Sequence, residues 1–132
     1  MKPFDLHILA STIIGEAKNE PDKGKAAVAW VVMNRLSRQR KSWGRTIAAV
    51  CLMPKQFSCW NDAFRRRLLT IDERNPLFVK CEHIATGVVS GEIPDPTGDA
   101  DHYYADYISP PDWAEKDKKT VVIGHHVFYK LT

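Results

Sequence analysis

Apolar residues recur at every third or fourth position over the first part of the chain. From Asp5 to about Asn19 this spacing predicts an amphipathic helix, which Pro21 should end. A second helix is predicted from about Asp22 to Arg38. Its segment 26–33 is apolar on every side, which is typical of a helix buried at the centre of a domain.

Capping residues and prolines predict a shorter helix further along. Thr46 is suited to cap a helix over Ile47 to Leu52, and Pro54 should stop it. The segment Lys55 to Trp60 has no helical spacing, so we expect a loop or a short strand there.

The last predicted helix starts at Asn75–Pro76 and runs to Gly91, with an apolar stripe along one side. Beyond it the composition changes to a loop rich in proline, glycine and aspartate. His102 to Ile108 and Thr120 to Tyr129 then have the pattern of extended segments, and Gly124 is suited to a turn between two strands. The sequence therefore predicts an α+β fold, mainly helical with a small C-terminal β-sheet.

The length and composition indicate one ordered domain over residues 1–132. Cys51, Cys59 and Cys81 are odd in number and lack CxxC spacing, so we expect buried free thiols. No basic and then apolar run opens the chain, and no apolar stretch reaches the roughly 18 residues that span a bilayer. We expect synthesis in the cytoplasm without a signal peptide and no stable membrane association.

Glu16 is the residue whose position suggests chemistry. On a helical wheel it falls about 20° from Leu9, at the flank of the apolar stripe, so its carboxyl group should be half-buried. Partial burial disfavours the charged form, which suits a general acid for glycosidic cleavage. Position alone favours a structural role, in which Glu16 caps the edge of the core and pairs with Lys18 or another basic residue. Glu20, one turn further on, could either perturb Glu16 or simply end the helix.

Several motifs together resemble the SleB/CwlJ cell wall hydrolase family. The first is Ile14-Gly-Glu-Ala-Lys-Asn-Glu-Pro21, followed by Gly24-Lys-Ala-Ala-Val-Ala29 and Val32-Met-Asn-Arg35. The others follow in the family's order: Gln56-Phe-Ser-Cys-Trp60, Asp101-His-Tyr-Tyr104, Pro111-Asp-Trp-Ala114 and Ile123-Gly-His-His-Val-Phe-Tyr129. The resemblance covers nearly the whole chain.

This resemblance implies that Glu16 is the catalytic acid and that the fold is similar to a trimmed lysozyme or lytic transglycosylase. The implied substrate is the peptidoglycan glycan strand, cleaved between MurNAc and GlcNAc, with no cofactor and no metal. The expected setting is a monomeric, single-domain phage endolysin that acts on the cell wall or periplasmic peptidoglycan after holin-dependent release.

Sugar rings are bound by aromatic faces, and their hydroxyl and N-acetyl groups by polar side chains. Residues on one strand alternate between its faces, so of Tyr103 and Tyr104 at most one should line a cleft. With the motifs above, the candidates for substrate binding are Glu20, Gln56, Phe57, Ser58, Trp60, His102, Tyr104, Trp113 and His126.

Two other functions remain open at this point. A zinc-dependent N-acetylmuramoyl-L-alanine amidase could draw ligands from His102, His125, His126, Asp99 and Asp101, although adjacent histidines on a strand point apart and no HExxH is present. A nucleic-acid-binding module could use the net charge of +3, bunched in Arg35 to Arg45 and Arg65 to Arg67, with Trp43 or Phe64 for stacking. No nucleic-acid motif accompanies these runs, which are more often solvated helix faces, so we expect no nucleic-acid partner.

The number of carboxylates decides between hydrolysis and transglycosylation. A usual hydrolase needs a second carboxylate about 5 to 9.5 Å from the acid. Asp62, Asp95, Asp99 and Asp101 fall in predicted loops, and nothing in the pattern places any of them opposite Glu16. The sequence therefore favours lytic transglycosylation, which requires only one carboxyl group.

Overall fold

The computed structural model describes residues 1–54 and 56–132, except for the side chains of Lys41 and of residues 62–64. The prediction for Lys55, the stacking role considered for Phe64 and the position of the Asp62 carboxylate therefore lie outside the described residues.

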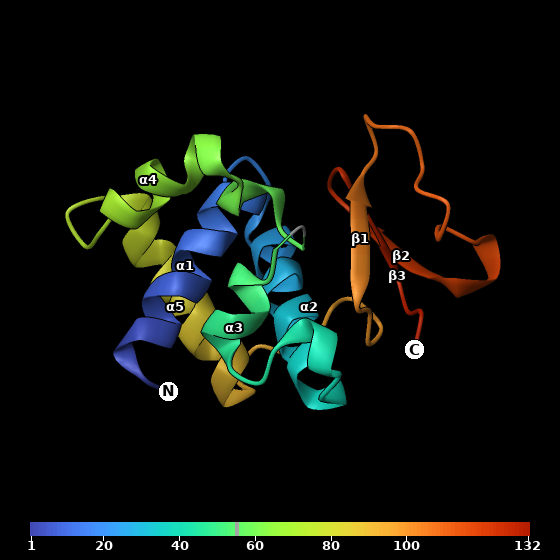
Figure 1. Ribbon diagram of the computed structural model, residues 1–132, viewed down its shortest axis with the longest axis horizontal. Coiled ribbons are helices and arrows are strands. Elements are labelled where there is room, and N and C mark those ends of the chain that lie inside the picture. The colour runs from blue at the N-terminus through green and yellow to red at the C-terminus, as the bar shows by residue number, and fades with distance from the viewer. Residues whose placement is uncertain (55) are drawn as a thin grey trace.

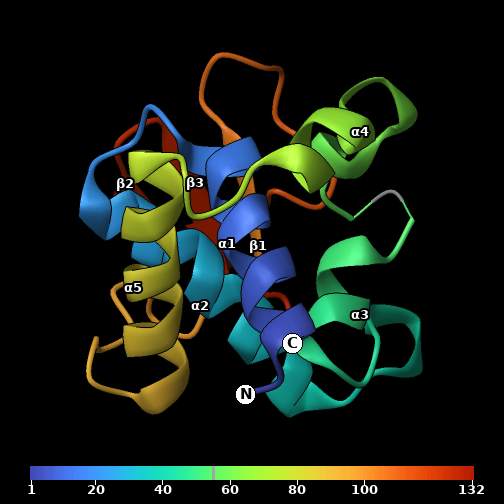
Figure 2. The ribbon, with the colours of Figure 1, turned by 90° about the vertical axis from the view of Figure 1, so that its left-hand side faces the viewer.

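The helices occupy one side of the molecule and a three-stranded sheet the other (Figure 1). Seen from the helical side, α1 runs across the centre, α5 lies to one side of it and α3 to the other (Figure 2). The α-helices are α1 (Pro3–Ala17), α2 (Asp22–Arg38), α3 (Ile47–Leu52), α4 (Asp62–Thr70) and α5 (Pro76–Ser90), with short 3-10 turns at Lys41–Trp43, Ser58–Trp60 and Lys116–Lys118.

Helix α2 lies between the other helices and the sheet. Its residues Ala26, Ala29 and Val32 belong to the helical core, whereas Ala27 and Val31 pack with Phe128 and other apolar residues on the sheet side. The prediction of a central helix, apolar on every side, is confirmed. Because α2 contributes to both cores, it fixes how the sheet sits against the helices.

The sheet consists of β1 (His102–Ala105), β2 (Lys119–Ile123) and β3 (His126–Tyr129) in the antiparallel order β1-β3-β2. Gly124, with φ of 57°, forms the turn between β2 and β3, as predicted. The first strand ends at Ala105 rather than Ile108, since the chain turns there and the Asp106 N–H donates to the carbonyl oxygen of His125 at 2.7 Å. Strand β1 is thus an edge strand beside the helices.

Most predicted helix ends are confirmed by their caps. The Thr46 hydroxyl accepts from the Ala49 N–H, Asn75 accepts from the Leu77 N–H, and Gly91 closes α5 with φ of 82°. The segment 58–60, expected as loop or short strand, forms a 3-10 turn and no strand. The prediction for Asp62 was wrong, because this residue begins α4 instead of lying in a loop.

Helix α4 was not predicted, because its apolar spacing is short and the run Arg65, Arg66 and Arg67 interrupts it between Phe64 and Leu68. Arg65, Arg66 and Arg67 are exposed, and among the described side chains of this helix Leu68 packs into the core. This contact lies against α1, close to Gly15. Tertiary packing therefore decides a helix that local spacing does not mark.

The three cysteines are free and buried, as predicted. Burial raises the pKa of the Cys51 thiol to about 12, so that this group remains a neutral part of the core. In the described part of the chain, none of the helices combines the length and apolar character needed to cross a membrane.

Candidate active site

Glu16 occupies the last turn of α1, and its side chain is half-buried, as predicted. Its Oε2 accepts a hydrogen bond from the Cys59 N–H at 3.1 Å and a long one from the Ser58 hydroxyl at 3.4 Å. Its Oε1 accepts from the Tyr103 hydroxyl. Donors from the 58–60 turn and from strand β1 therefore converge on one carboxyl group.

Gly15 allows the 58–60 turn to approach α1 this closely. A Cβ atom at Gly15 would lie 2.4 Å from the Cβ of Cys59, which is far inside van der Waals contact. The glycine before Glu16 is thus required for the Cys59 N–H to reach the carboxylate.

Tyr103 is the buried partner of Glu16. Burial, together with the negative charge of Glu16, raises the pKa of the Tyr103 phenol well above its usual value, so the hydroxyl stays protonated and acts as a donor. Its ring is packed by Phe57, His126 and Phe128, with centroids 6.5, 4.7 and 5.5 Å away. The orientation of one carboxylate oxygen is therefore fixed by the sheet.

A cavity of about 580 Å³ opens at Glu16 between the helices and the sheet. This volume suits a small polar ligand such as one or two sugar units. Among the described residues its walls are formed by Gly15, Glu16, Arg35, Gln56, Ser58, Asn61, Tyr103, Tyr104, Ala105, Tyr107, Ile108, Pro111, Trp113 and His126. Five predicted substrate-binding residues, Gln56, Ser58, Tyr104, Trp113 and His126, are brought together here. We call this space the first cavity.

The expectation that only one of Tyr103 and Tyr104 could line a cleft was wrong. Both border the first cavity, although they lie on opposite faces of β1. Since β1 is the edge strand, a cavity that follows its free edge reaches side chains from both faces. Tyr104 packs with Tyr129 and Trp113, with ring centroids 5.9 and 6.1 Å away.

Arg35 lies in the wall of the first cavity and was not among the predicted site residues. Its Nε donates to the Asp101 carbonyl oxygen at 2.7 Å and its Nη1 to Gln56 Oε1 at 3.1 Å, so it holds Gln56 in place. Burial lowers the pKa of the guanidinium. The signal for Arg35 is its place on α2 close after the apolar segment 26–33, whereas its charge alone places it with the basic run 35–45.

Phe57, Trp60 and His102 are predicted substrate contacts that lie outside the first cavity. Phe57 is 2% and Trp60 9% exposed, and the Trp60 indole N–H donates to the Thr12 hydroxyl at 2.9 Å. His102 Nδ1 lies 2.8 Å from Asp101 Oδ1, and its ring packs on Trp113. These aromatic groups pack within the fold, and their predicted contact with substrate stays a prediction.

Glu20 is also occupied within the protein. Its buried carboxylate accepts from the His125 N–H at 2.9 Å and lies 3.7 Å from His126 Nδ1. Gly124 is required here, because a Cβ at that position would lie 2.5 Å from Glu20 Oε1. Glu20 therefore ties the β2–β3 turn to the segment that follows α1, and its predicted role in substrate binding stays a prediction.

A second cavity, of about 720 Å³, adjoins the first at Glu16. The two share Gly15, Glu16, Ser58, Asn61, Tyr107 and His126. The second is bordered in addition by Lys18, Asn19, Glu20, Arg67 and His125, among others. Glu16 thus lies where two connected cavities meet.

The histidines considered as metal ligands lie in separate pairs. His102 faces Asp101, His125 faces Asp106 at 3.2 Å, and His126 faces Glu20. Among the described residues, no group of three or more His, Cys, Asp and Glu side chains is arranged to hold a metal ion.

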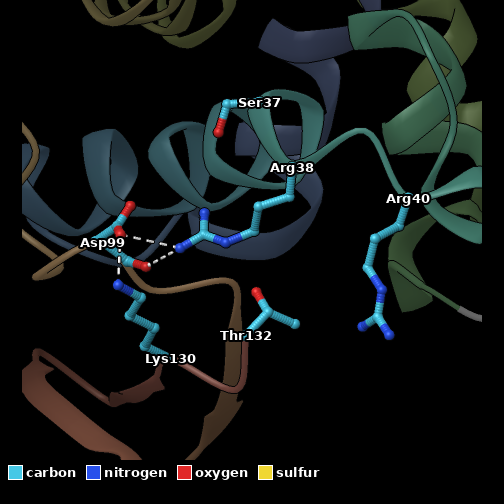
Figure 3. A pocket seen from close by; sticks show the side chains of 6 residues that line it. All are labelled: Ser37, Arg38, Arg40, Asp99, Lys130 and Thr132. Carbon is cyan, nitrogen blue, oxygen red and sulfur yellow. Dashed lines mark hydrogen bonds and ion pairs between the residues drawn. The ribbon is translucent and has the colours of Figure 1, made fainter.

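A third cavity lies away from Glu16, at the end of α2 (Figure 3). Arg38 Nη2 lies 3.0 Å and Lys130 Nζ 2.9 Å from Asp99 Oδ2, so both of these cations are paired with one carboxylate. Arg40 stacks over Trp43, which is 5% exposed. The stacking role considered for Trp43 with nucleic acid is not compatible with this burial.

Solved structures with the same fold cover nearly the whole chain. The catalytic domain of the germination-specific lytic transglycosylase SleB from Bacillus anthracis has a TM-score of 0.78 and 27% identity, covering 98% of this chain and 97% of that one. The catalytic domain of the Bacillus cereus SleB protein has a TM-score of 0.77 at 24% identity, over 98% and 91% of the two chains. The chain thus has the fold of a SleB catalytic domain, and the predicted fold class is confirmed.

Residues 19–129 match the sequence profile of the family described as Cell Wall Hydrolase, and the chain belongs to this family. The spore cortex-lytic enzymes of Bacillus cereus and Oceanobacillus iheyensis are 28% and 26% identical to it over 126 residues, which is 96% of this chain. Because so little of this chain lies outside these two alignments, Glu16 falls within them. The chain spans 44% and 41% of the length of these relatives. The predicted membership of the SleB/CwlJ family is confirmed.

Proposed function

We propose that the chain degrades peptidoglycan by cleaving the glycosidic bond between MurNAc and GlcNAc, with Glu16 as the catalytic acid. The observation that carries this proposal is the position of the Glu16 carboxyl group, which is held by three donors at the junction of two connected cavities. A strand of sugars that passes through both cavities would present one of its bonds to Glu16.

The first step is proton transfer from Glu16 to the glycosidic oxygen. Tyr103 holds Oε1, so we assign the transferable proton to Oε2. The Ser58 contact to Oε2, at 3.4 Å, is longer than an ordinary O–H···O hydrogen bond and is easily exchanged for a substrate oxygen. Protonation lets the leaving sugar depart as a neutral alcohol while positive charge develops at the anomeric carbon of MurNAc.

In the second step the Glu16 carboxylate removes the proton from the 6-hydroxyl group of the same MurNAc. The freed oxygen forms a bond to the anomeric carbon, which closes a 1,6-anhydro ring and returns the proton to Glu16. The nucleophile belongs to the substrate, so its fixed position lowers the entropic part of the barrier. No water is consumed.

The distribution of carboxylates supports this route over hydrolysis. Among the described side chains that line the first cavity, Glu16 is the only carboxylate. Glu20 borders the second cavity, but its Oε1 accepts the His125 N–H and lies near His126 Nδ1. A hydrolase would need a second carboxylate on the opposite face of the sugar. The similar SleB domain of Bacillus anthracis is described as a lytic transglycosylase, which also supports the proposal.

The first cavity supplies groups suited to a sugar ring. Trp113 and Tyr104 offer aromatic surface, and Gln56, Ser58 and His126 offer polar atoms. We assign substrate contact to these five residues. Host lysis by a phage, holin-dependent release and a monomeric state stay predictions.

The bond that is cut can be determined directly. Purified sacculi are digested with the protein, and the released fragments are analysed by mass spectrometry. Cleavage between MurNAc and GlcNAc, with stem peptides still attached to the sugars, is the expected result. Free stem peptides together with intact glycan strands would instead identify an amidase and overturn the proposal.

A further inference from the structure

We propose that the second cavity binds the free carboxylates of peptidoglycan stem peptides through Lys18 and Arg67. This inference rests on the proposed function, because it concerns the substituents of the same glycan strand. It assigns the two cavities different tasks: the first receives sugar rings and the second receives the peptide carried by a muramoyl residue.

The two cations come from separate elements and border one space. Lys18 follows directly after α1, two positions beyond Glu16, and Arg67 lies on α4. Both side chains are exposed, and neither forms an ion pair with a described carboxylate. Two positive charges are therefore available to a ligand in the second cavity.

Two carboxyl groups, those of Glu16 and Glu20, also border this cavity, but neither forms an ion pair with Lys18 or Arg67, and Glu16 is held by Cys59 and Tyr103. The carboxylate of Glu20 is buried and accepts the His125 N–H at 2.9 Å. In the third cavity, by comparison, Asp99 forms ion pairs with both Arg38 and Lys130 (Figure 3). The unpaired charges of the second cavity favour an anionic ligand.

The substrate carries such an anion at a suitable place. Each MurNAc bears a lactyl-linked peptide whose residues have free carboxylates, whereas the sugar backbone itself is uncharged. A muramoyl residue bound at Glu16 directs this peptide away from the sugar plane and toward a neighbouring space. The second cavity adjoins Glu16, and the exposed amides of Asn19 and Asn61 can bind peptide groups there.

Three forms of glycan strand distinguish the effect of the peptide carboxylates from the effect of the size of the peptide. The first carries intact peptides, the second carries peptides whose carboxyl groups have been converted to amides, and the third has been stripped of peptides by an amidase. For each, kcat/KM of the purified protein is measured from the release of new chain ends at low and at moderate salt.

The variants are Lys18→Gln and Arg67→Gln, with Arg66→Gln as the matched control. Arg66 is exposed on the same helix and carries the same charge, but it does not border the second cavity. Each cavity variant should lower kcat/KM on intact strands about two- to fivefold, as expected for one exposed ion pair. On amidated and stripped strands, both variants should keep nearly the wild-type kcat/KM. On intact strands, the loss of kcat/KM should become smaller as salt is added.

Equal losses on all three substrates would overturn the inference, because the cations would then serve the glycan or the fold. An equal loss for Arg66→Gln would also overturn it, since the effect would come from the long-range field alone. If the wild-type protein cleaved intact and stripped strands equally well, peptide recognition would be excluded while the proposed function stood. Failure to cut glycosidic bonds in any of the three substrates would contradict the proposed function itself.

Discussion

The Tyr103 hydroxyl donates a hydrogen bond to the carboxylate of Glu16 across 87 positions of sequence. This contact joins the edge strand of the sheet to the last turn of α1. It connects the two halves of the fold at the point where chemistry is proposed. The behaviour of this pair therefore tests both the site and the way the fold builds it.

Replacement of Glu16 by glutamine should abolish lysis of purified sacculi with little change in thermal stability. The substitution keeps the shape of the side chain but removes the proton donor, whose contribution to rate is typically about 10² to 10⁴. Initial rates and thermal unfolding would be measured together. Glu92→Gln, at an exposed glutamate outside the described cavities, serves as the control. Near wild-type lysis by Glu16→Gln would refute the assignment.

Replacement of Tyr103 by phenylalanine should lower kcat about 10- to 100-fold, with a much smaller change in KM. The ring keeps its packing, but Glu16 Oε1 loses a charge-assisted hydrogen bond, a contact typically worth about 1.5 to 3 kcal/mol. Steady-state kinetics on soluble glycan strands would separate the two constants. A change in KM alone would show that Tyr103 contacts substrate rather than positioning the acid.

The stability of the protein should fall as the pH is lowered from about 7.5 to 5, in part because of His126. Burial lowers the pKa of His126 below the ordinary value of 6.5, so below that pH the unfolded chain binds a proton that the native state resists. The free energy of unfolding therefore decreases with acidification. His126→Asn should give a flatter pH dependence in urea titrations, with wild type and variant compared at pH 7.5 as the reference. An unchanged slope would show that His126 does not contribute to the pH dependence.

Prolonged treatment with EDTA should leave activity on metal-free sacculi unchanged. The proposed reaction uses a side-chain carboxyl group and a substrate hydroxyl group, and no step requires a metal ion. Activity of the dialysed protein would be assayed before and after addition of Zn²⁺. If activity were lost on chelation and recovered with zinc, the protein would be a zinc-dependent amidase rather than a transglycosylase.

Much of the fold could be predicted because its signals are local. The all-round apolar character of 26–33 is sufficient to place α2 at the centre, and Thr46, Asn75 and Gly91 mark helix ends through their own backbone contacts. Helix α4 could not be predicted in this way, since three exposed arginines interrupt its short apolar spacing, and among its described side chains Leu68 packs into the core.

The site was predicted less completely because its contacts are long-range. The flank position of Glu16 follows from the helical wheel, but the approach of Cys59 depends on the absence of a side chain at Gly15. The choice between Tyr103 and Tyr104 depends on which strand forms the sheet edge, which strand spacing does not reveal. Trp60 is of a residue type that often binds sugar rings, yet its indole N–H donates to the Thr12 hydroxyl in the core.

Transglycosylation and hydrolysis differ in the oxygen atom that attacks the anomeric carbon of MurNAc. Digestion of purified sacculi in ¹⁸O-labelled water, followed by mass spectrometry of the glycan ends, distinguishes them most directly. The predicted products are MurNAc residues that end in a 1,6-anhydro ring and contain no label. Reducing-end MurNAc carrying ¹⁸O would contradict the proposed mechanism, because it would show that water attacks the anomeric carbon and that a second group activates it.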